Sequence, residues 1–373
     1  MHNGFMLFCA LNAVKGMVIN MNYLDKEILE KANEEAIYNL YLYLTHKLAP
    51  LENESLQTIT QNLEQAYRDK PYDWDKKAIR RLLLLKNALI SNATLSLSQI
   101  GSLTYSKGGL TACIFTKPDG SISVVFKGTG SGEWIDNGEG LSGIPEENVY
   151  ATFSHSGEIT DSTAVKKDYA TDQQTEALNW FNKTAAMERW NSNTPITVSG
   201  HSKGGNKAQF VTIHSDLVND CYSFAGQGFS PEALRFIKKR YGEDYESRRQ
   251  RIYSFSSDND YVNVLGNRLV PQNHIYYFES GDGIHNMEAI LDKRGRLRQQ
   301  CNQGMLSAYA EKLSKDLMKM NPSVRQYATL GIMNIFQKYL GEGIPVNGDS
   351  VSTEKTLIGI AVAVGSFLRN LGK

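Results

Sequence analysis

The segment best suited to chemistry is Gly200-His201-Ser202-Lys203-Gly204. A β-rich run over 195–199 leads into it, and a helix-compatible run over 207–213 follows. Strand, sharp corner and helix is the order of a nucleophile elbow, in which small residues must stand two positions before and after the Ser. Gly200 and Gly204 meet this requirement, so the segment predicts a serine nucleophile. The alternative interpretation is a glycine-rich turn with a passive Ser.

A serine nucleophile needs a histidine to take its proton and a carboxylate to orient that histidine. In one large group of such enzymes, the acid and then the histidine follow the serine along the chain, on loops after strands. His285 follows a strand-like run in a Gly-rich loop and is the preferred base, whereas His274 lies within that run and is expected to be structural. Asp260 is the preferred acid because the apolar residues after it should fix its orientation. Asp258 and Asp282 remain alternatives.

Two groups are candidates for stabilising the oxyanion that forms when a serine attacks an ester. A β-type run ends in Lys127-Gly128-Thr129-Gly130, where Thr129 can offer both its amide and its hydroxyl. The amide of Lys203, at the start of the predicted helix, is the second candidate. An ordinary Gly-rich loop is the alternative interpretation of the first segment. This chemistry requires neither a metal nor a cofactor, so none is expected.

The elements that must position these residues follow from the hydrophobic period, which changes twice along the chain. Apolar residues recur at helical spacing up to about residue 93, β-type runs alternate with helices from about 103 to 291, and helical spacing returns near 302. The pattern predicts an α/β fold with a mostly parallel central sheet and helices on both faces, extended by helices at both ends. We divide the chain into a helical N-terminal region (1–100), an α/β core (101–300) and a helical C-terminal region (301–373).

Individual elements can be placed within this division. Glu and Lys residues of the N-terminal helices are expected on the face away from the core. The stretch Gly138–Asp161 predicts an irregular loop over a cleft, and Lys117-Pro118-Asp119-Gly120 predicts a hairpin turn. Helices are expected over 24–44, 55–68, 74–90, 168–190, 231–241, 306–318, 324–340 and 352–371, and strands over 110–116, 121–126, 195–199, 221–225, 251–256 and 274–278.

The composition excludes several classes of partner. The chain has 373 residues, and its 40 basic residues balance its 40 acidic ones. A nucleic-acid or polyacidic partner is therefore not expected. The four cysteines are far apart, which argues against a metal site or a disulfide framework. Cys113 and Cys221 lie in strand-like runs and are expected to be buried thiols.

Neither terminal apolar run predicts a membrane span. No Lys or Arg precedes Gly4–Val14, so a secretory signal is not expected, and localisation stays open between the cytoplasm and export. The patterned sequence begins at Asn22, which makes Met17 and Met21 alternative starts. Leu357–Leu368 is shorter than the roughly 20 apolar residues that cross a bilayer. A buried helix is its expected role, and an interfacial anchor is the alternative.

The chain resembles the class 3 lipases, the family of the fungal triacylglycerol lipases. The resemblance covers roughly residues 103–291 and rests on Gly200-His201-Ser202-Lys203-Gly204-Gly205, Val125-Phe126-Lys127-Gly128-Thr129 and Asp260-Tyr261-Val262. It implies an α/β-hydrolase fold, a Ser202-Asp260-His285 triad and an oxyanion donor at Thr129. Three positions depart from the family: Lys203 replaces its usual Leu, Lys127 replaces its usual Arg, and the Pro after Asp-x-Val is absent. With these departures, the chain is more similar to a bacterial branch of lipase-like hydrolases.

The expected function is therefore hydrolysis of a carboxylic ester by a lipase or esterase, through an acyl-enzyme. A small-molecule or lipid ester is the expected substrate, with a membrane surface as a further expected contact. The residues indicate no particular acyl-chain length or oligomeric state. One alternative is a non-catalytic, hydrolase-like binding module in which the helical ends do the work. Another is a membrane-damaging phospholipase effector, suggested by Leu357–Leu368.

Overall fold

A computed structural model describes residues 23–48, 51–106, 109–129, 134–143, 169–281, 283–322, 325–326 and 328–329. Outside these residues lie the predicted helix 352–371, most of the predicted helix 324–340, the apolar runs Gly4–Val14 and Leu357–Leu368, and Asp282. In the described part of the chain, no helix is long and apolar enough to cross a membrane. The division of the chain at residues 100 and 300 stays a prediction.

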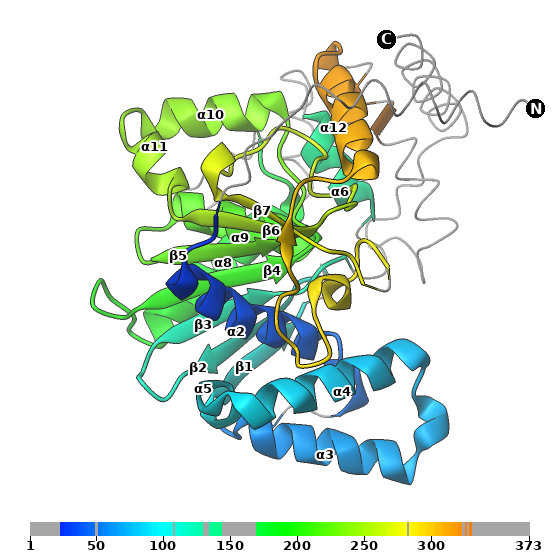
Figure 1. Cartoon of the computed structure of the whole chain (residues 1–373). Helices are drawn as coiled ribbons and strands as arrows, with labels where there is room; N and C mark the ends of the chain where they lie inside the picture. Colours follow the sequence, from blue (N-terminus) through cyan, green and yellow to red (C-terminus); the bar gives the residue numbers. More distant parts are fainter. Residues whose placement is uncertain are drawn as a thin grey trace, which may run out of the picture.

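One sheet of eight strands forms the centre of the fold, and its strands lie side by side in their sequence order (Figure 1). β3 to β7 run parallel, whereas β1, β2 and β8 pair antiparallel at the two edges. This confirms the predicted mostly parallel sheet, although neither β1 nor β8 was predicted. The strands are β1 (Gln99–Tyr105), β2 (Thr111–Thr116), β3 (Ile122–Phe126), β4 (Ile196–His201), β5 (Asp220–Phe224), β6 (Ile252–Ser257), β7 (Ile275–Phe278) and β8 (Gln300–Cys301).

Helices cover both faces of the sheet, as predicted, but the two faces have different origins. Because neighbouring parallel strands are consecutive in the sequence and such connections are right-handed, the connecting helices fall on one face. The N-terminal helices pack on the other, so the sheet separates two hydrophobic cores. The connecting helices are α8 (Asp172–Met187), α9 (Lys203–His214), α10 (Pro231–Tyr241) and α11 (Asp244–Arg249); the N-terminal ones are α2 (Lys26–Leu42), α3 (Leu56–Asp69), α4 (Lys76–Ser91) and α5 (Ala93–Leu97).

Strand β3 illustrates how the sequence builds both cores. Val125 belongs to the core under the N-terminal helices, whereas Val124 and Phe126 belong to the core under α8 and α9. Side chains alternate between faces along a strand, so a strand that is covered on both sides is mostly apolar. The polar residue of β3, Ser123, is buried but hydrogen-bonded to Glu35. Cys113 and Cys221 are buried free thiols, as predicted, and one lies in each core.

The remaining elements surround the sheet and include one that was predicted as a loop. Residues 138–142, expected to be irregular, belong to helix α6, and the rest of that stretch beyond residue 143 lies outside the described residues. His274 ends a short 3₁₀ turn before β7 instead of lying in the strand. These elements are α6 (Trp134–Ser142), α12 (Met305–Met318) and the 3₁₀ turns η1 (Thr45–Lys47), η2 (Pro71–Asp73), η4 (Gln272–His274) and η5 (Met287–Ile290).

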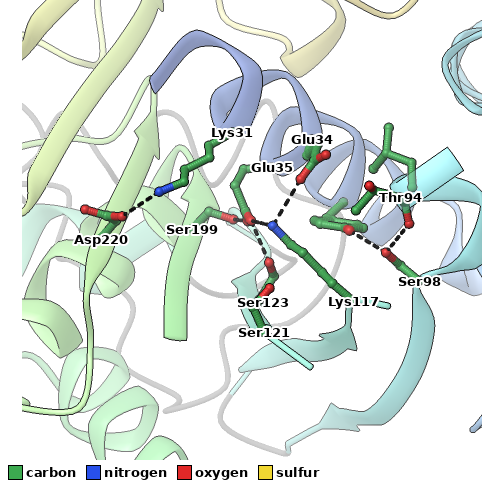
Figure 2. A network of polar contacts seen from close by, with 12 residues as sticks. Lys31, Glu34, Glu35, Thr94, Ser98, Lys117, Ser121, Ser123, Ser199 and Asp220 are labelled. Atoms are coloured by element: carbon green, nitrogen blue, oxygen red, sulfur yellow. Dashed lines mark hydrogen bonds and ion pairs between the residues drawn. The ribbon is translucent and has the colours of Figure 1, made fainter. Parts of the chain in front are cut away.

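The expectation that acidic residues of the N-terminal helices face outward is wrong for Glu35 on α2. Its side chain is fully buried against the sheet, where it accepts hydrogen bonds from the Ser123 hydroxyl at 2.6 Å and the Ser199 hydroxyl at 2.8 Å (Figure 2). Lys117 pairs with Glu35 at 3.4 Å and with Glu34 at 3.1 Å. Because α2 is enclosed between the sheet and α4, a polar residue there needs partners inside the protein. The network joins α2 to β3 and β4.

We expect replacement of Glu35 by Ala to lower the free energy of unfolding by about 3–5 kcal/mol, the usual cost of breaking a buried ion pair. The change removes the acceptor of two buried hydroxyls and one of the two carboxylates around Lys117. Glu35→Gln keeps a side chain that can hydrogen-bond both serines and should lose less than half as much. Urea unfolding of both variants measures the difference, and equal losses would contradict this account.

His214, a partly buried histidine at the end of α9, should make stability depend on pH. Burial, with a smaller contribution from the Arg240 and Arg248 guanidinium groups, lowers the pKa of His214 to about 3. In the unfolded chain this histidine is protonated below a pKa of about 6.5, whereas in the folded chain it stays neutral. Stability is therefore lost as the pH falls below that value. Between pH 7.5 and pH 5 the free energy of unfolding of the wild type should fall by about 1–2 kcal/mol more than that of His214→Phe. Denaturant titrations at both pH values measure the free energy of unfolding of each protein. Equal changes with pH in the wild type and in His214→Phe would contradict the prediction.

Candidate active site

Ser202 occupies the corner between β4 and α9, with φ 59° and ψ −124°. A residue with a side chain adopts such a positive φ only at a cost of about 1–3 kcal/mol, which the surroundings must offset. Its amide donates to the carbonyl oxygen of Phe224 on β5 at 2.8 Å, which holds the strained corner against the neighbouring strand. A parallel sheet with a strained Ser between strand and helix is the α/β-hydrolase fold, as predicted.

The backbone around the corner leaves no room for side chains at two glycines. A Cβ atom on Gly200 would lie 2.1 Å from the carbonyl oxygen of Gly204, and one on Gly204 would lie 2.0 Å from that of Phe126. These separations are far below van der Waals contact, so any larger residue would force the strand and the helix apart. The requirement for small residues at both positions is therefore a packing constraint imposed by the fold.

A chain of hydrogen bonds connects the three residues that were favoured for catalysis. The Ser202 hydroxyl lies 2.9 Å from Nε2 of His285, and Nδ1 of the same ring lies 2.8 Å from Oδ2 of Asp260. A carboxylate only accepts, so Nδ1 carries the hydrogen, and in the neutral ring Nε2 accepts from the Ser202 hydroxyl. The Asp260 side chain is 1% exposed and that of His285 is 24% exposed. The arrangement can deprotonate Ser202 while keeping the new charge on the histidine paired.

The turn after β6 fixes Asp260 in this position. Its Oδ1 accepts from the amides of Val262 at 2.7 Å and Asn263 at 3.0 Å, which leaves Oδ2 for His285. Asp258, the alternative acid, instead accepts from the amide and side chain of Asn259 and from the Ser280 hydroxyl. The structure therefore brings Asp260, and not Asp258, to the histidine.

His274 and His201 have structural contacts of different kinds. His274, the alternative base, stacks on Tyr253 with ring centroids 4.5 Å apart and does not join the hydrogen-bond chain of Ser202. Burial, with a contribution from the His285 ring, holds the pKa of His201 well below its usual range, so this ring is neutral. Nε2 of His201 donates to the His285 carbonyl oxygen at 2.8 Å, and Nδ1 accepts from the Tyr43 hydroxyl at 2.7 Å. His201 thus supports the loop that carries His285.

The N-terminal helices extend this support beyond the sheet. Arg81 on α4 forms an ion pair with Glu288 on η5, with contacts of 3.2 and 3.3 Å, just after His285 in the chain. The same guanidinium lies 4.6 Å from the centroid of the Tyr43 ring. Planar, paired contacts of this kind restrict both partners. The helical N-terminal region therefore holds the loop of His285 although it contributes no member of the hydrogen-bond chain.

The two candidate oxyanion donors follow the ends of two neighbouring strands, β3 and β4. Phe126 at the end of β3 pairs with Gly200 near the end of β4, so the segment that carries Thr129 and the corner that carries Lys203 leave the sheet at the same edge. A Cβ atom on Gly128 would lie 3.2 Å from Cβ of Ser202, which shows how closely this segment passes the nucleophile. The Lys203 amide begins α9, where backbone N–H groups have no acceptor within the helix. The Lys203 amide is thus next to Ser202 in the chain, and Thr129 follows the glycine that passes the nucleophile.

Comparison with known proteins finds no matching family model and no matching curated protein. Among solved structures, the chain is similar to a mutant form of MDLA from Penicillium cyclopium, with 12% identity and a TM-score of 0.39 over 72% of this chain and 86% of that chain. Lipase II from Rhizopus niveus gives 12% identity and 0.35 over 69% and 80% of the two chains. A triacylglycerol lipase from Penicillium expansum gives 12% and 0.31 over 57% and 87%.

The Lys203 side chain points into the protein and pairs with Asp136 on α6. It is 0% exposed, and the Asp136 side chain is 11% exposed. Asp136 also accepts from the Thr171 hydroxyl at 3.0 Å and from the Gln173 amide at 3.2 Å, both at the start of α8. A buried charge is tolerated only with such a set of partners. This explains how a lysine occupies the position of the leucine that the resemblance leads one to expect.

Sequence reasoning missed four residues that hold the site together: Tyr43, Arg81, Asp136 and Asn137. The contacts of Tyr43 with His201 and of Arg81 with Glu288 span 158 and 207 residues, so no local pattern could have indicated them. Asp136 and Asn137 follow soon after Thr129, and two adjacent polar residues beside a candidate oxyanion loop were the available signal. Among the described residues, no three acidic, histidine or cysteine side chains form a group that could hold a metal ion.

Proposed function

We propose that the protein is a serine hydrolase that cleaves carboxylic esters, as a lipase or esterase does. The single observation that carries the proposal is the hydrogen-bond chain from the strained Ser202 through His285 to the buried Asp260. A nucleophile, a base and an orienting carboxylate in this geometry define nucleophilic acyl transfer. The resemblance of the surrounding motifs to class 3 lipases favours a lipid ester among the substrates.

The reaction proceeds through an acyl-enzyme. Oγ of Ser202 attacks the ester carbonyl while His285 takes its proton, and Asp260 stabilises the resulting imidazolium. The tetrahedral oxyanion accepts hydrogen bonds from Thr129 and from the amide of Lys203. His285 then gives the proton to the departing alcohol as the C–O bond breaks. Water, deprotonated by His285, attacks the acyl-enzyme and releases the carboxylic acid with a regenerated Ser202.

Labelling with a fluorophosphonate probe tests this proposal directly. The probe forms an Oγ–P bond with an activated serine as fluoride leaves, and it does not react with serines that lack a base. We expect stoichiometric labelling of the native protein on the peptide that contains Ser202, and none after denaturation in urea. Native protein that is not labelled would favour the alternative, a non-catalytic module with a hydrolase fold.

A membrane-damaging phospholipase remains a narrower form of the same proposal. Its motivation, Leu357–Leu368, lies outside the described residues, so it rests on the sequence alone. Hydrolysis of phospholipid vesicles against that of soluble p-nitrophenyl esters separates the two substrate classes. Turnover of the soluble esters without any release of fatty acid from vesicles would exclude the phospholipase.

A further inference from the structure

We propose that the side chain of Lys203 is a positioning residue for the oxyanion hole, acting through α6 on the Thr129 hydroxyl. The inference rests on the proposed ester hydrolysis and deepens it. It concerns the side chain of a residue whose amide alone has a role in the mechanism above. Three contacts carry the inference, and they connect the two oxyanion donors to each other through the interior of the protein.

The first contact is the buried ion pair between Lys203 and Asp136. Nζ of Lys203 also lies 3.4 Å from the backbone carbonyl oxygen of Asp136, so the ammonium group holds both the side chain and the backbone of α6. A Cβ atom added to Gly140, one turn further along α6, would lie only 3.7 Å from the same Nζ. The helix therefore packs closely around the ammonium group, and its first turn is tied to the start of α9.

The second contact belongs to the next residue of α6. Nδ2 of Asn137 donates to Oγ1 of Thr129 at 3.0 Å, and the backbone carbonyl oxygen of Asn137 accepts from Gln227 at 3.3 Å. Successive residues on a helix point in different directions, so Asp136 can face Lys203 while Asn137 faces Thr129. Tying down Asp136 therefore also fixes Asn137.

The consequence for Thr129 follows from the inventory of its hydroxyl group. A hydroxyl accepts with its lone pairs and donates one hydrogen, which rotates to suit its partners. Because Asn137 donates to Oγ1, the hydrogen of Thr129 is left to donate elsewhere. It is then available to the oxyanion, for which a preoriented donor is worth far more than one that must reorganise. Without Asn137 in place, the hydroxyl rotates freely.

The third contact anchors the other side of Asp136. The Thr171 hydroxyl and the Gln173 amide donate to its two carboxylate oxygens at the start of α8. Gln174 of the same turn donates to Asn206 on α9 at 2.7 Å, and Asn206 donates in turn to the carbonyl oxygens of Gln227 and Gly228. Hydrogen bonds are strong in the low dielectric of the interior, so a network of them restricts the side chains that it joins. The ion pair thus joins α6 to a fixed frame made by α8 and α9.

A double-mutant cycle on ester turnover tests the proposal. Lys203→Met keeps an unbranched side chain, one heavy atom shorter, but leaves Asp136 without its ammonium partner, and Thr129→Val removes the hydroxyl itself. Active sites are counted by the end point of fluorophosphonate labelling, and kcat is expressed per labelled site. Each single variant should lower kcat by about 10²-fold with little change in KM, since an oxyanion donor acts in the transition state. The double variant should be no more than about threefold slower than the slower single variant, because both changes remove the same donor.

Three outcomes of these measurements would contradict the proposal. Losses that multiply in the double variant would overturn the coupling between Lys203 and Thr129. Fewer labelled sites with unchanged kcat per site in Lys203→Met would also overturn it, because the ion pair would then only stabilise the fold. If Lys203→Met does not fold, Lys203→Met with Asp136→Leu removes both buried charges and carries the same expectation. A wild type that neither hydrolyses esters nor is labelled would overturn the proposed function itself.

Lys207 provides the matched control, since it is a second fully buried lysine one turn further along α9. We expect Lys207→Met to lower the number of labelled sites if it lowers stability, and to leave kcat per site within about twofold of the wild type. A loss of kcat per site as large as that of Lys203→Met would show that disturbing α9 anywhere has this effect, and would overturn the specific role of Lys203.

Discussion

Replacing Ser202 by Ala is expected to lower kcat for ester hydrolysis by about 10⁶-fold, the loss that removal of a serine nucleophile causes in a comparable triad. The change deletes the attacking oxygen and one hydrogen bond to His285, while the strained corner and its bond to Phe224 remain. The variant should therefore fold normally and still bind substrate. Turnover of a series of p-nitrophenyl esters, followed to the background rate of the buffer, measures the loss.

Ser256→Ala is the matched control for that experiment. Ser256 is fully buried on β6, and its hydroxyl has no hydrogen-bond partner among the described residues. Removing an unpaired buried hydroxyl is nearly neutral or stabilising, so kcat should stay within about twofold of the wild type. Equal turnover by the wild type and Ser202→Ala would eliminate Ser202 as the nucleophile.

Replacing Asp260 by Asn is expected to lower kcat by about 10⁴-fold, as the corresponding change does in serine proteases. The two backbone amides that bind Oδ1 of Asp260 would continue to select an oxygen there. The new amide nitrogen would then face His285, whose Nδ1 must become an acceptor. In the neutral ring the hydrogen moves to Nε2, where it faces Ser202 and prevents proton transfer. The expected loss of kcat thus comes from the wrong tautomer of His285, while the geometry of the site stays intact.

Asp258→Asn tests whether position and not charge explains that loss. Asp258 lies two residues away after the same strand, but its partners are Asn259 and Ser280. We expect its replacement to change kcat by no more than about threefold. The pH dependence of kcat/KM for both variants completes the measurement. A loss in Asp258→Asn that matched the loss in Asp260→Asn would show that a general negative charge, not the bond to His285, is what the reaction needs.

The sequence by itself determined the features that depend on local sterics and periodicity. The elbow could be predicted because Gly200 and Gly204 flank Ser202 at the spacing that a strand-to-helix corner demands, and the contacts of 2.1 and 2.0 Å show why no other residue fits. The order of β2 to β7 followed from runs of apolar residues and from the turn at Lys117–Gly120. The edge strands β1 and β8 were not predicted because β1, apart from the buried Ile100, is at most partly buried and lacks a clear alternation, and β8 has only two residues.

Other features needed the tertiary structure because their causes lie far apart in the chain. Glu35 was expected to face outward, since its own helix gives no sign of the serines on β3 and β4 that bind it. Asp260 and Asp258 follow the same strand, and only the course of the turn brings one of them to His285. The choice between the two could be argued from sequence but not decided there.

The same distinction applies to Lys203, which the sequence marked only as a departure from the lipase pattern. Its amide role follows from its position after Ser202, a local property of any such elbow. The role of its side chain depends on Asp136, which lies 67 residues earlier and reaches it only when α6 packs against α9. Local backbone geometry depends on neighbouring residues in the sequence, whereas the partner of a buried charge depends on how the whole fold packs.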